Sequence, residues 1–559
     1  MYHFPNDSAG QQAKELYESS LFNNFRFADA KIDISVAYQG SQPNTHRWNH
    51  GILDNGDIVG NNFVYEASAT PNNTFGLGAV NVDTVTLDVL YSSQNAEILD
   101  DIDADVVGDE GSYSNAEFYI QLGYGHESPY TDSGYIAGKT ALVPLGTFVM
   151  QEKACKVGEN KYTLKLQSLI TRFDRDLPAV FNSTNNSVMT QILQDRGIQA
   201  PDLLAILEWC CHYVPRTGYW DSNGDFHYAT RMQLSSKMDM TTAEGRAYVA
   251  SIPNLTGHQF TISQDTGYLT YRDIVKDIAT LCCSFATTDE VGNLLLVPFA
   301  PMTELCERLN DGITQDTTQT PTVDICTKYQ ENLGVFKIKQ IKCLGTIEEQ
   351  QGGQTVEVEA DYSRPTQYTG TPNYYDITGT KLLVCIDDPN DIVNVVDEIA
   401  NSILYNTVSS SNLGAANYRP IPFDIETASG DFRLRLGDWV SCISNFSDRL
   451  GNKFYCKAQI MRMTLRLNGK ARYQSFVLPS DNDRNASKRQ SEAQGDYPTP
   501  EGGEAPPPPE PPVVIMDDMG QWLFGDEEGI REEYEAVGEP GRTYYVSQVG
   551  QWSFNNTAL

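Results

Sequence analysis

The stretch FRLRLGDWVSCISNFSDRLGNKFYCKAQIMRMTLRLNGKARYQSF, residues 432–476, constrains the fold of this chain more than any other segment. Apolar and polar residues alternate through it, which is the period of a strand buried on one face. The pair Asn468-Gly469 separates two such runs and predicts a tight hairpin turn. Gly437-Asp438 interrupts the first run, where we expect the strand to bend. The stretch therefore predicts a wall of antiparallel strands that begins at Phe432.

The same alternation recurs in two blocks, residues 28–180 and 319–480, each of which we expect to be a β domain. Thirty tyrosines and 43 glycines agree with a β-rich chain that has many turns. The second block is interrupted by one helix near 389–405, which follows Asp388-Pro389. Residues 1–27 are predicted to be an N-terminal arm with a short helix at 11–21.

Residues 181–318, between the two blocks, predict a helix-plus-hairpin domain. Its strongest helix pattern is TYRDIVKDIATLCCSF, where Thr270 and Asp273 resemble a capping box. The apolar face of that helix has the spacing i, i+3, i+4 and i+7. ATTDEVGNLLLVPF follows directly and predicts a hairpin with its turn at Gly292-Asn293. The predicted fold class is thus a β-rich α+β multidomain protein.

Three segments depart from this regular pattern. Residues 95–115 are acidic and serine-rich and predict an inserted loop. Residues 481–512 end in a proline run and predict an extended, disordered linker. Residues 513–559 form a small C-terminal module with two similar motifs, GQWLF and GQWSF. These motifs fit either a strand pair anchored by Trp522 and Trp552 or a docking module for another protein.

The charge and the cysteines limit the class of protein. Lys and Arg number 40 against 74 Asp and Glu, a formal net charge of −34, which argues against nucleic acid as a tightly held partner. We expect no secretion signal, because the N-terminus lacks a basic and an apolar region, and no membrane span. The adjacent pairs Cys210-Cys211 and Cys282-Cys283 predict buried, reduced thiols and folding in a reducing cytoplasm.

A search for chemistry yields no catalytic, cofactor-binding or metal residue. Gly76 and Gly78 precede a strand pattern rather than a helix, so they do not form a phosphate cradle. His46 and His50 have zincin spacing but lack its glutamate. An acidic run resembles the start of a calcium loop, but it lacks the glycine and the closing glutamate; these residues are Asp101, Asp103, Asp105, Val106 and Ser112. We therefore expect no cofactor, and no enzyme.

The order of four motifs resembles the tail hub proteins of tailed bacteriophages, also called tail-associated or baseplate hub proteins. The motifs are FGLG at 75–78, PLGTF at 144–148, the helix and Gly292 hairpin, and YRPIPFDIETASGDFRLRLGD at 418–438. The resemblance covers residues 28–480. It implies two tail-tube-like β-barrel domains, the first at 28–180 and the second at 319–480, that flank the helical one.

The resemblance also implies a function. Such hubs are homotrimers that close the distal end of the tail tube, adapt a six-fold tube to a three-fold tip and form part of the DNA exit channel. The implied partners are a distal tail or tail tube protein above, a tape measure protein inside, and tail fibre, spike or other tip proteins below, through residues 513–559. DNA is met only in transit. The location would be the virion tail tip, after assembly in the host bacterial cytoplasm.

Two other classes remain open from the residues alone. One is a tail-associated enzyme that degrades cell walls, since a catalytic triad is assembled in space and leaves no fixed sequence trace. The other is an adhesin that binds host-surface carbohydrate through the aromatic C-terminal module, with Trp522 and Trp552 as its local support.

Overall fold

A computed structural model covers residues 1–559 and divides into two units, Met1–Ala493 and Gln494–Leu559. The boundary between them falls inside the predicted proline-rich linker. The residues that the structure describes are 2, 4–27, 32–39, 45–50, 63–69, 77–97, 99, 117–124, 141–156, 158, 160–178, 186–216, 218–220, 226–299, 307–310, 326–331, 340–351, 354–364, 374–388, 391–403, 421–427, 430–447, 453–466, 471–477, 513–516, 522–525, 543–546 and 552–554.

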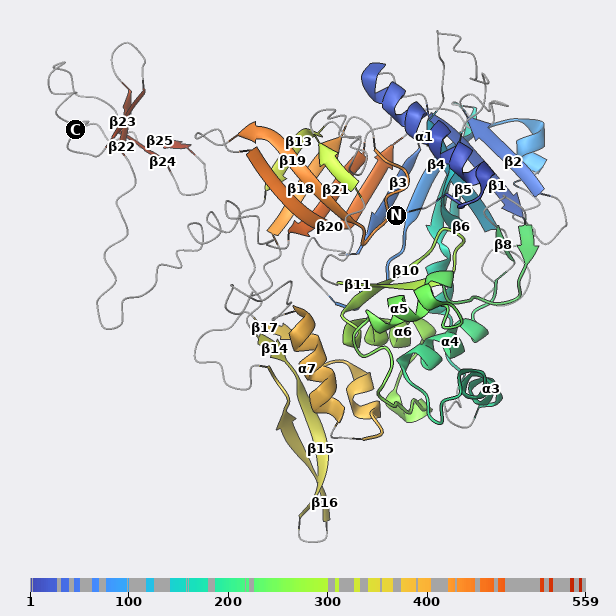
Figure 1. Ribbon diagram of the computed structural model, residues 1–559, viewed down its shortest axis with the longest axis vertical. Coiled ribbons are helices and arrows are strands. Elements are labelled where there is room, and N and C mark those ends of the chain that lie inside the picture. The colour runs from blue at the N-terminus through green and yellow to red at the C-terminus, as the bar shows by residue number, and fades with distance from the viewer. Residues whose placement is uncertain are drawn as a thin grey trace. The chain divides into compact units, whose positions relative to one another are not determined.

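Helices and strands are mixed along the first unit (Figure 1). The α-helices are α1 (Ser8–Phe27), α3 (Ser187–Arg196), α4 (Leu203–Tyr213), α5 (Ala243–Ala250), α6 (Tyr271–Leu281) and α7 (Asp391–Ile403). The 3-10 helices are η3 (Leu169–Asp174), η4 (Ser236–Met238), η5 (Gln264–Thr266) and η6 (Lys381–Cys385). The strands up to the middle of the chain are β1 (Ile32–Gln39), β2 (Thr45–His50), β3 (Val64–Ser68), β4 (Thr84–Leu90), β5 (Glu117–Tyr124), β6 (Val143–Lys156), β7 (Lys161–Ser168), β8 (Gly218–Trp220), β9 (Phe226–Tyr228), β10 (Ser284–Thr288) and β11 (Leu294–Pro298).

The later strands of this unit are β12 (Glu307–Asn310), β13 (Cys326–Glu331), β14 (Gln340–Lys342), β15 (Leu344–Gln351), β16 (Gln354–Asp361), β17 (Tyr374–Asp376), β18 (Ile421–Thr427), β19 (Trp439–Ser447), β20 (Lys453–Arg466) and β21 (Ala471–Val477). Thirteen strands form one curled, half-barrel sheet in the order β13-β18-β21-β20-β3-β4-β7-β6-β5-β1-β2 (Figure 1). In addition, β19 pairs with β20, and β12 pairs with β19. All of its pairs are antiparallel except that of β12 with β19.

The two predicted β blocks meet inside this sheet. β20 pairs with β3 from Arg462 opposite Ser68 to Arg466 opposite Val64, so strands from both ends of the first unit are hydrogen-bonded neighbours. The structure thus joins the two blocks through one continuous sheet, where the sequence predicts two barrels flanking a helical domain. The physical reason is that β3 and β20 each offer an edge that the other satisfies, a long-range pairing that no local pattern encodes.

The helix and the hairpin predicted for the middle of the chain are both present in the structure. α6 begins at the predicted capping box: Thr270 Oγ1 accepts from the Asp273 amide and the Asp273 carboxylate accepts from the Thr270 amide. Its apolar face is fully buried, as expected from the spacing; it comprises Tyr271, Ile274, Val275, Ile278 and Leu281. β10 and β11 pair antiparallel directly after it, and Gly292 has φ +86° in their turn.

The predicted strand from Phe432 is wrong. Residues 431–438 form turns, and the strand β19 begins only at Trp439. The apolar side chains of this segment, at Phe432, Leu434 and Leu436, are buried as the alternation predicts. Arg433 between them is also buried, because it pairs with Asp431, and a strand with one wet face does not bury both sets. The hairpin around Asn468-Gly469 is supported by β20 and β21, which pair antiparallel up to Leu465 opposite Ala471, although the turn lies outside the described residues.

Three further predictions concern the N-terminal arm, the acidic segment 95–115 and the helix near 389–405. The helix of the N-terminal arm is longer than expected and spans α1, Ser8–Phe27. The acidic segment 95–115 was predicted as a loop, but residues 93–97 are helical and Asn95 is buried, where it accepts a hydrogen bond from Trp48. The helix predicted near 389–405 is α7. In the described part of the chain, no helix has the length and apolar character needed to cross a membrane.

The second unit is a four-stranded sheet in the order β23-β22-β24-β25, formed by β22 (Val513–Met516), β23 (Trp522–Gly525), β24 (Thr543–Val546) and β25 (Trp552–Phe554). The two GQW motifs therefore lead into the outer strands, β23 and β25. Trp522 is opposite Met516 and Trp552 is opposite Val546 in the register. The strands that carry the two tryptophans therefore do not pair with each other, and the predicted strand pair is corrected to a four-stranded sheet.

Candidate functional site

The segment 431–438 is the place where distant parts of the first unit meet. Described residues of four stretches contact it: the N-terminal residues with α1, the start of β6, the β10–β11 hairpin, and β20. They come from the beginning, the middle and the end of the unit, so this short segment ties together regions that are hundreds of residues apart. We call these contacts the junction.

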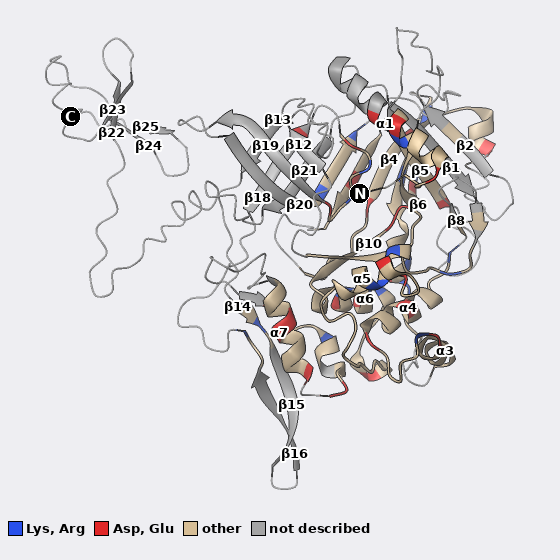
Figure 2. Ribbon diagram, in the orientation of Figure 1, with Lys and Arg blue, Asp and Glu red and all other residues tan. Residues whose placement is uncertain are grey.

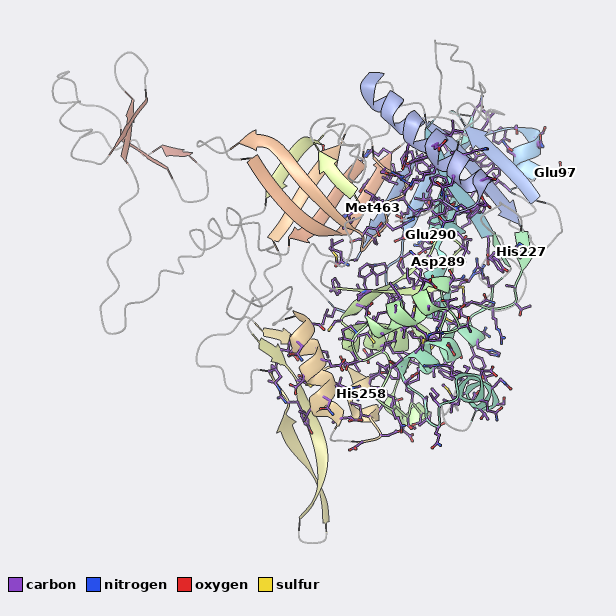
Figure 3. All side chains as sticks on the ribbon, viewed as in Figure 1. Glu97, His227, His258, Asp289, Glu290 and Met463 are labelled. Atoms are coloured by element: carbon purple, nitrogen blue, oxygen red, sulfur yellow. The ribbon has the colours of Figure 1, made fainter. Side chains whose placement is uncertain are left out.

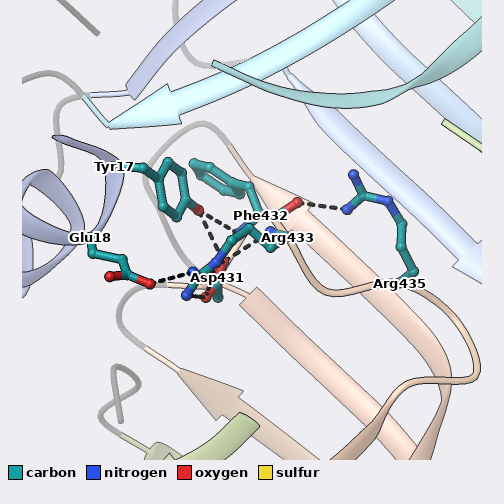
Figure 4. Close-up of polar contacts among 6 residues, drawn as sticks. All are labelled: Tyr17, Glu18, Asp431, Phe432, Arg433 and Arg435. Carbon is teal, nitrogen blue, oxygen red and sulfur yellow. Dashed lines mark hydrogen bonds and ion pairs between the residues drawn. The ribbon is translucent and has the colours of Figure 1, made fainter. Parts of the chain in front are cut away.

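The first half of the junction is a buried ion pair (Figure 4). Arg433 Nε donates to both carboxylate oxygens of Asp431 at 3.0 and 2.9 Å, and its Nη1 donates to Glu18 of α1 at 2.8 Å. The Tyr17 hydroxyl donates to Asp431 Oδ1 at 3.1 Å and accepts from the Phe432 amide at 2.9 Å. A buried carboxylate bound by a guanidinium and a hydroxyl has its charge and lone pairs satisfied. This cluster fixes α1 on the segment.

The second half of the junction uses backbone groups. The Arg435 guanidinium donates to Phe432 O at 2.6 Å, to Leu434 O at 2.7 Å and to Pro144 O of β6. The Gly437 amide donates to Ile460 O of β20 at 2.7 Å, and the Ile460 amide donates back to Asp438 O at 2.9 Å. One arginine and one pair of reciprocal backbone bonds thus hold the segment to two different strands.

Glycines of three sequence motifs lie at points of close approach in or beside the junction. A Cβ at Gly437, which has φ +87°, would lie 2.2 Å from Val297 Cγ1 of β11. A Cβ at Gly78 would lie 1.9 Å from Thr280 Oγ1 of α6, and one at Gly292 would lie 2.6 Å from Leu169 Cδ1 and 3.1 Å from Thr147 Cβ. Real Cβ atoms do not approach other atoms so closely, so glycine lets these backbones pack.

The motif segments therefore converge in space. The Gly78 amide donates to Ser284 O of β10, and residues 79–81 continue along β10. Thr147 belongs to the PLGTF motif and lies beside Gly292, while Pro144 of the same motif accepts from Arg435. FGLG, PLGTF, the Gly292 hairpin and the 418–438 stretch are far apart in sequence, but described residues of each contact another around the β10–β11 hairpin.

A cavity of about 210 Å³ lies inside the junction, and we call it the Asp83 cavity. Tyr65 of β3 donates its hydroxyl hydrogen to Asp83 Oδ2 at 3.2 Å, and Asp83 is 7% exposed. Asp83 Oδ1 and Arg435 Nε are buried and have no hydrogen-bond partner in the described part of the chain. Burial raises the pKa of Asp83 to about 7, and it outweighs the opposing effects of the Tyr65 hydrogen bond and Arg435.

The tip of the β10–β11 hairpin supplies two more carboxylates to this cavity, Asp289 and Glu290 (Figure 3). Asp289 Oδ1 accepts from the amides of Val291 and Asn293, which closes the turn. Burial and the neighbouring Glu290 charge raise the pKa of Asp289 to about 6. Burial alone would raise the pKa of Glu290, but Lys237, 3.9 Å away, and Arg435 lower it.

A third buried network lies beside the hairpin turn. Glu117 of β5 is fully buried and accepts from Arg172 Nη1 at 2.6 Å and from Arg216 Nε at 3.5 Å. Arg216 also donates to Asn293 Oδ1 at 2.7 Å and to Val291 O. This network anchors the turn of the hairpin to the sheet through Glu117 of β5.

The residues that the sequence analysis considered as candidates for chemistry do not form one site in the described part of the chain. His46 and His50 lie in the strand β2 rather than in a helix. Cys210, Cys211, Cys282 and Cys283 are buried free thiols, as predicted. Gly76 and the acidic run 101–112 lie outside the described residues. Among the residues that are described, no group of three His, Cys, Asp or Glu side chains could hold a metal ion.

Sequence reasoning missed the polar residues of the junction. Asp431, Arg433 and Arg435 stand in the alternating run DFRLRL, where they look like the wet face of a strand. The available signal was the charge pattern: an acid two residues before an arginine, in a run that contains a Gly-Asp turn. Asp83 and Tyr65 leave no such sign, because their contact depends on the pairing of β3 with β4. The polar side chains of the junction thus bind backbone groups and hold distant segments of the chain together.

Comparison with known proteins gives structural neighbours only. No family model and no curated protein matches the sequence. Similar solved structures include the tail protein from Neisseria meningitidis, with TM-score 0.35, 10% identity and coverage of 80% of this chain and 96% of that chain. The 43 kDa tail protein of prophage MuSo2 from Shewanella oneidensis has TM-score 0.30, 8% identity and coverage of 80% and 98%. A prophage tail protein from Listeria monocytogenes has TM-score 0.30, 10% identity and coverage of 83% and 98%.

All three of these neighbours are tail proteins, the class that the order of motifs predicts. Their overlay on this chain is loose, with TM-scores of 0.35 or lower. The function below is therefore built on the motifs and contacts of this chain.

Proposed function

We propose that this chain is a structural protein of a phage tail, the hub that closes the distal end of the tail tube. The observation that carries the proposal is the convergence of the motif segments around the β10–β11 hairpin. The residues that the resemblance selects meet at points of close backbone packing. They hold a sheet, a hairpin and a helix together, and this supports a structural role such as that of a hub.

In this proposal the chain forms a homotrimer. Each copy would contribute two related β regions, so three copies offer six β elements to a six-fold tube and three-fold symmetry to the tip. A ring also covers exposed sheet edges, which otherwise pair with unwanted partners. The tape measure protein would lie inside, the distal tail or tube protein above, and tip proteins below, with residues 513–559 as one attachment point.

The acidic composition fits a channel through which DNA passes without binding. The formal charge of −34 would repel a phosphate backbone. α7, for example, carries Asp391, Asp397 and Glu398 and no Lys or Arg (Figure 2). If the channel-facing surface of an assembled ring proved to be net basic, this part of the proposal would be withdrawn.

The solution mass of the recombinant chain tests the proposal. Light scattering should give about three times the chain mass of 62.2 kDa, and negative-stain images should show three-fold rings. A truncation that removes residues 481–559 should still be a trimer, with about three times the mass of its own shorter chain, because the sheet and junction lie in the first unit. A stable dimer, or a chain that stays monomeric when mixed with isolated tail tubes, would contradict the hub. Zymography on purified cell walls provides the second readout, since a clear lysis zone would favour an enzyme.

A further inference from the structure

The Asp83 cavity contains a carboxyl group with a raised pKa, and it lies between the segments that the junction joins. Its walls come from β3, from residues just before β4, from β6, α5, η4 and β20, from the β10–β11 hairpin and from the segment 431–438. Asp83 itself is anchored to the sheet, because its amide donates to Ser168 Oγ at 3.1 Å and its carbonyl accepts from the Ser168 amide at 2.8 Å. The backbone of Asp83 is therefore held by the sheet rather than by the segment 431–438.

The polar groups of the cavity do not offset the burial of Asp83, although Tyr65 and Arg435 both lower its pKa. Tyr65 supplies one neutral hydrogen bond to Oδ2, and Oδ1 has none. The Arg435 guanidinium is committed to the carbonyls of Phe432, Leu434 and Pro144, with its Nε left over. Lys237 is paired with Glu290. The other titratable groups that face the cavity are Tyr248, Asp289 and Asp438.

We propose that the Asp83 cavity is a pH-sensitive latch, which is closed while Asp83 is protonated and which loosens the segment 431–438 when Asp83 ionises. A buried carboxylate without a cationic partner is costly, so ionisation favours any state that admits water to Oδ1. The most direct such state parts the segment 431–438 from β6 and β20. The contacts that this opening breaks include the Arg435–Pro144 bond, the two backbone bonds at Gly437 and Asp438, and the bond from Gln459 Nε2 to Gly437 O at 2.9 Å.

The direction of the effect follows from linkage. The folded pKa of Asp83, about 7, lies above its ordinary value of 3.8, so burial costs nothing extra below pH 3.8. Closure weakens as the pH rises from there and stops weakening above about pH 7. If the open state restores the ordinary pKa, the opening constant rises about thirtyfold between pH 5.5 and 8. Asp289 changes in the same direction but by less, because its pKa is raised only to about 6.

Hydrogen exchange of the full chain tests the latch. The reporters are the amides of Gly437 and Ile460, which bridge the segment and β20. After correction for intrinsic exchange rates, we expect their protection to fall at least about thirtyfold from pH 5.5 to 8 in the wild type. Asp83→Asn keeps the shape but cannot ionise, so its protection should fall less than about fivefold, the part left to Asp289. Equal pH dependence in wild type and Asp83→Asn overturns the proposal.

Two further variants keep the test decisive if Asp83→Asn folds poorly. Tyr65→Phe removes the hydrogen bond that lowers the pKa of Asp83, so the transition should move to higher pH. An unchanged or lower midpoint in Tyr65→Phe also overturns the latch. Asp265→Asn, a change of the same chemistry at an exposed position in η5, is the control and should reproduce the wild-type curve.

Discussion

Two of the buried carboxylates at the junction, Asp431 and Asp83, have different sets of hydrogen-bond partners. Asp431 and Asp83 each accept a hydrogen bond from a tyrosine hydroxyl, from Tyr17 at 3.1 Å and from Tyr65 at 3.2 Å. Asp431 also receives both a fork from Arg433 and its backbone amide, whereas Asp83 keeps one oxygen without a partner. The same tyrosine–aspartate unit therefore makes a fixed tie where a guanidinium completes it, and a site sensitive to protonation where none does.

The largest effect should come from breaking the completed pair. Arg433→Ala leaves Asp431 buried without its cation, which typically costs about 3–5 kcal/mol of unfolding free energy. Urea denaturation followed by circular dichroism measures this loss. Arg246→Ala, which removes an exposed arginine bound to two backbone carbonyls, is the matched control and should cost less than about 1 kcal/mol. Equal losses in the two variants would mean that the Asp431 cluster is not a tie.

An intermediate effect should come from the turn that both halves share. Gly437→Ala places a Cβ 2.2 Å from Val297 Cγ1 at a residue with φ +87°, so the segment or β11 has to shift. We expect a loss of about 1–3 kcal/mol, together with faster hydrogen exchange at the Ile460 amide. Gly379→Ala, where nothing lies within 4 Å of the added Cβ, should leave both measurements nearly unchanged.

The smallest effect should come from removing the tyrosine hydroxyl at the Asp431 site. Tyr17→Phe removes one donor to Asp431 and one acceptor for the Phe432 amide, while Arg433 still pairs the carboxylate. We expect a loss of about 1 kcal/mol, measured by the same urea titration. A loss as large as that of Arg433→Ala would show that the tyrosine, rather than the guanidinium, completes the Asp431 site.

Local signals were sufficient for the middle of the chain. Thr270 and Asp273 predict the start of α6, and Gly292 predicts the hairpin turn. Such predictions work because caps and turns depend on residues only three or four positions apart. The segment at Phe432 misled the same reasoning, since a buried ion pair between Arg433 and Asp431 lets charged residues take inward positions. The pairing of β20 with β3 and the contact of Tyr65 with Asp83 depend on partners that only the folded sheet brings together.

The bond between Tyr17 and Asp431 has a consequence for the time at which this protein can fold. The two residues are 414 positions apart, and both are buried in the same cluster. At about 5–20 residues per second, a ribosome needs about 20–80 s to proceed from one to the other. During that interval α1 and β3 are synthesised but lack the residues that cover them. The N-terminal part of the chain must therefore wait, or be shielded, until translation of the first unit is almost complete.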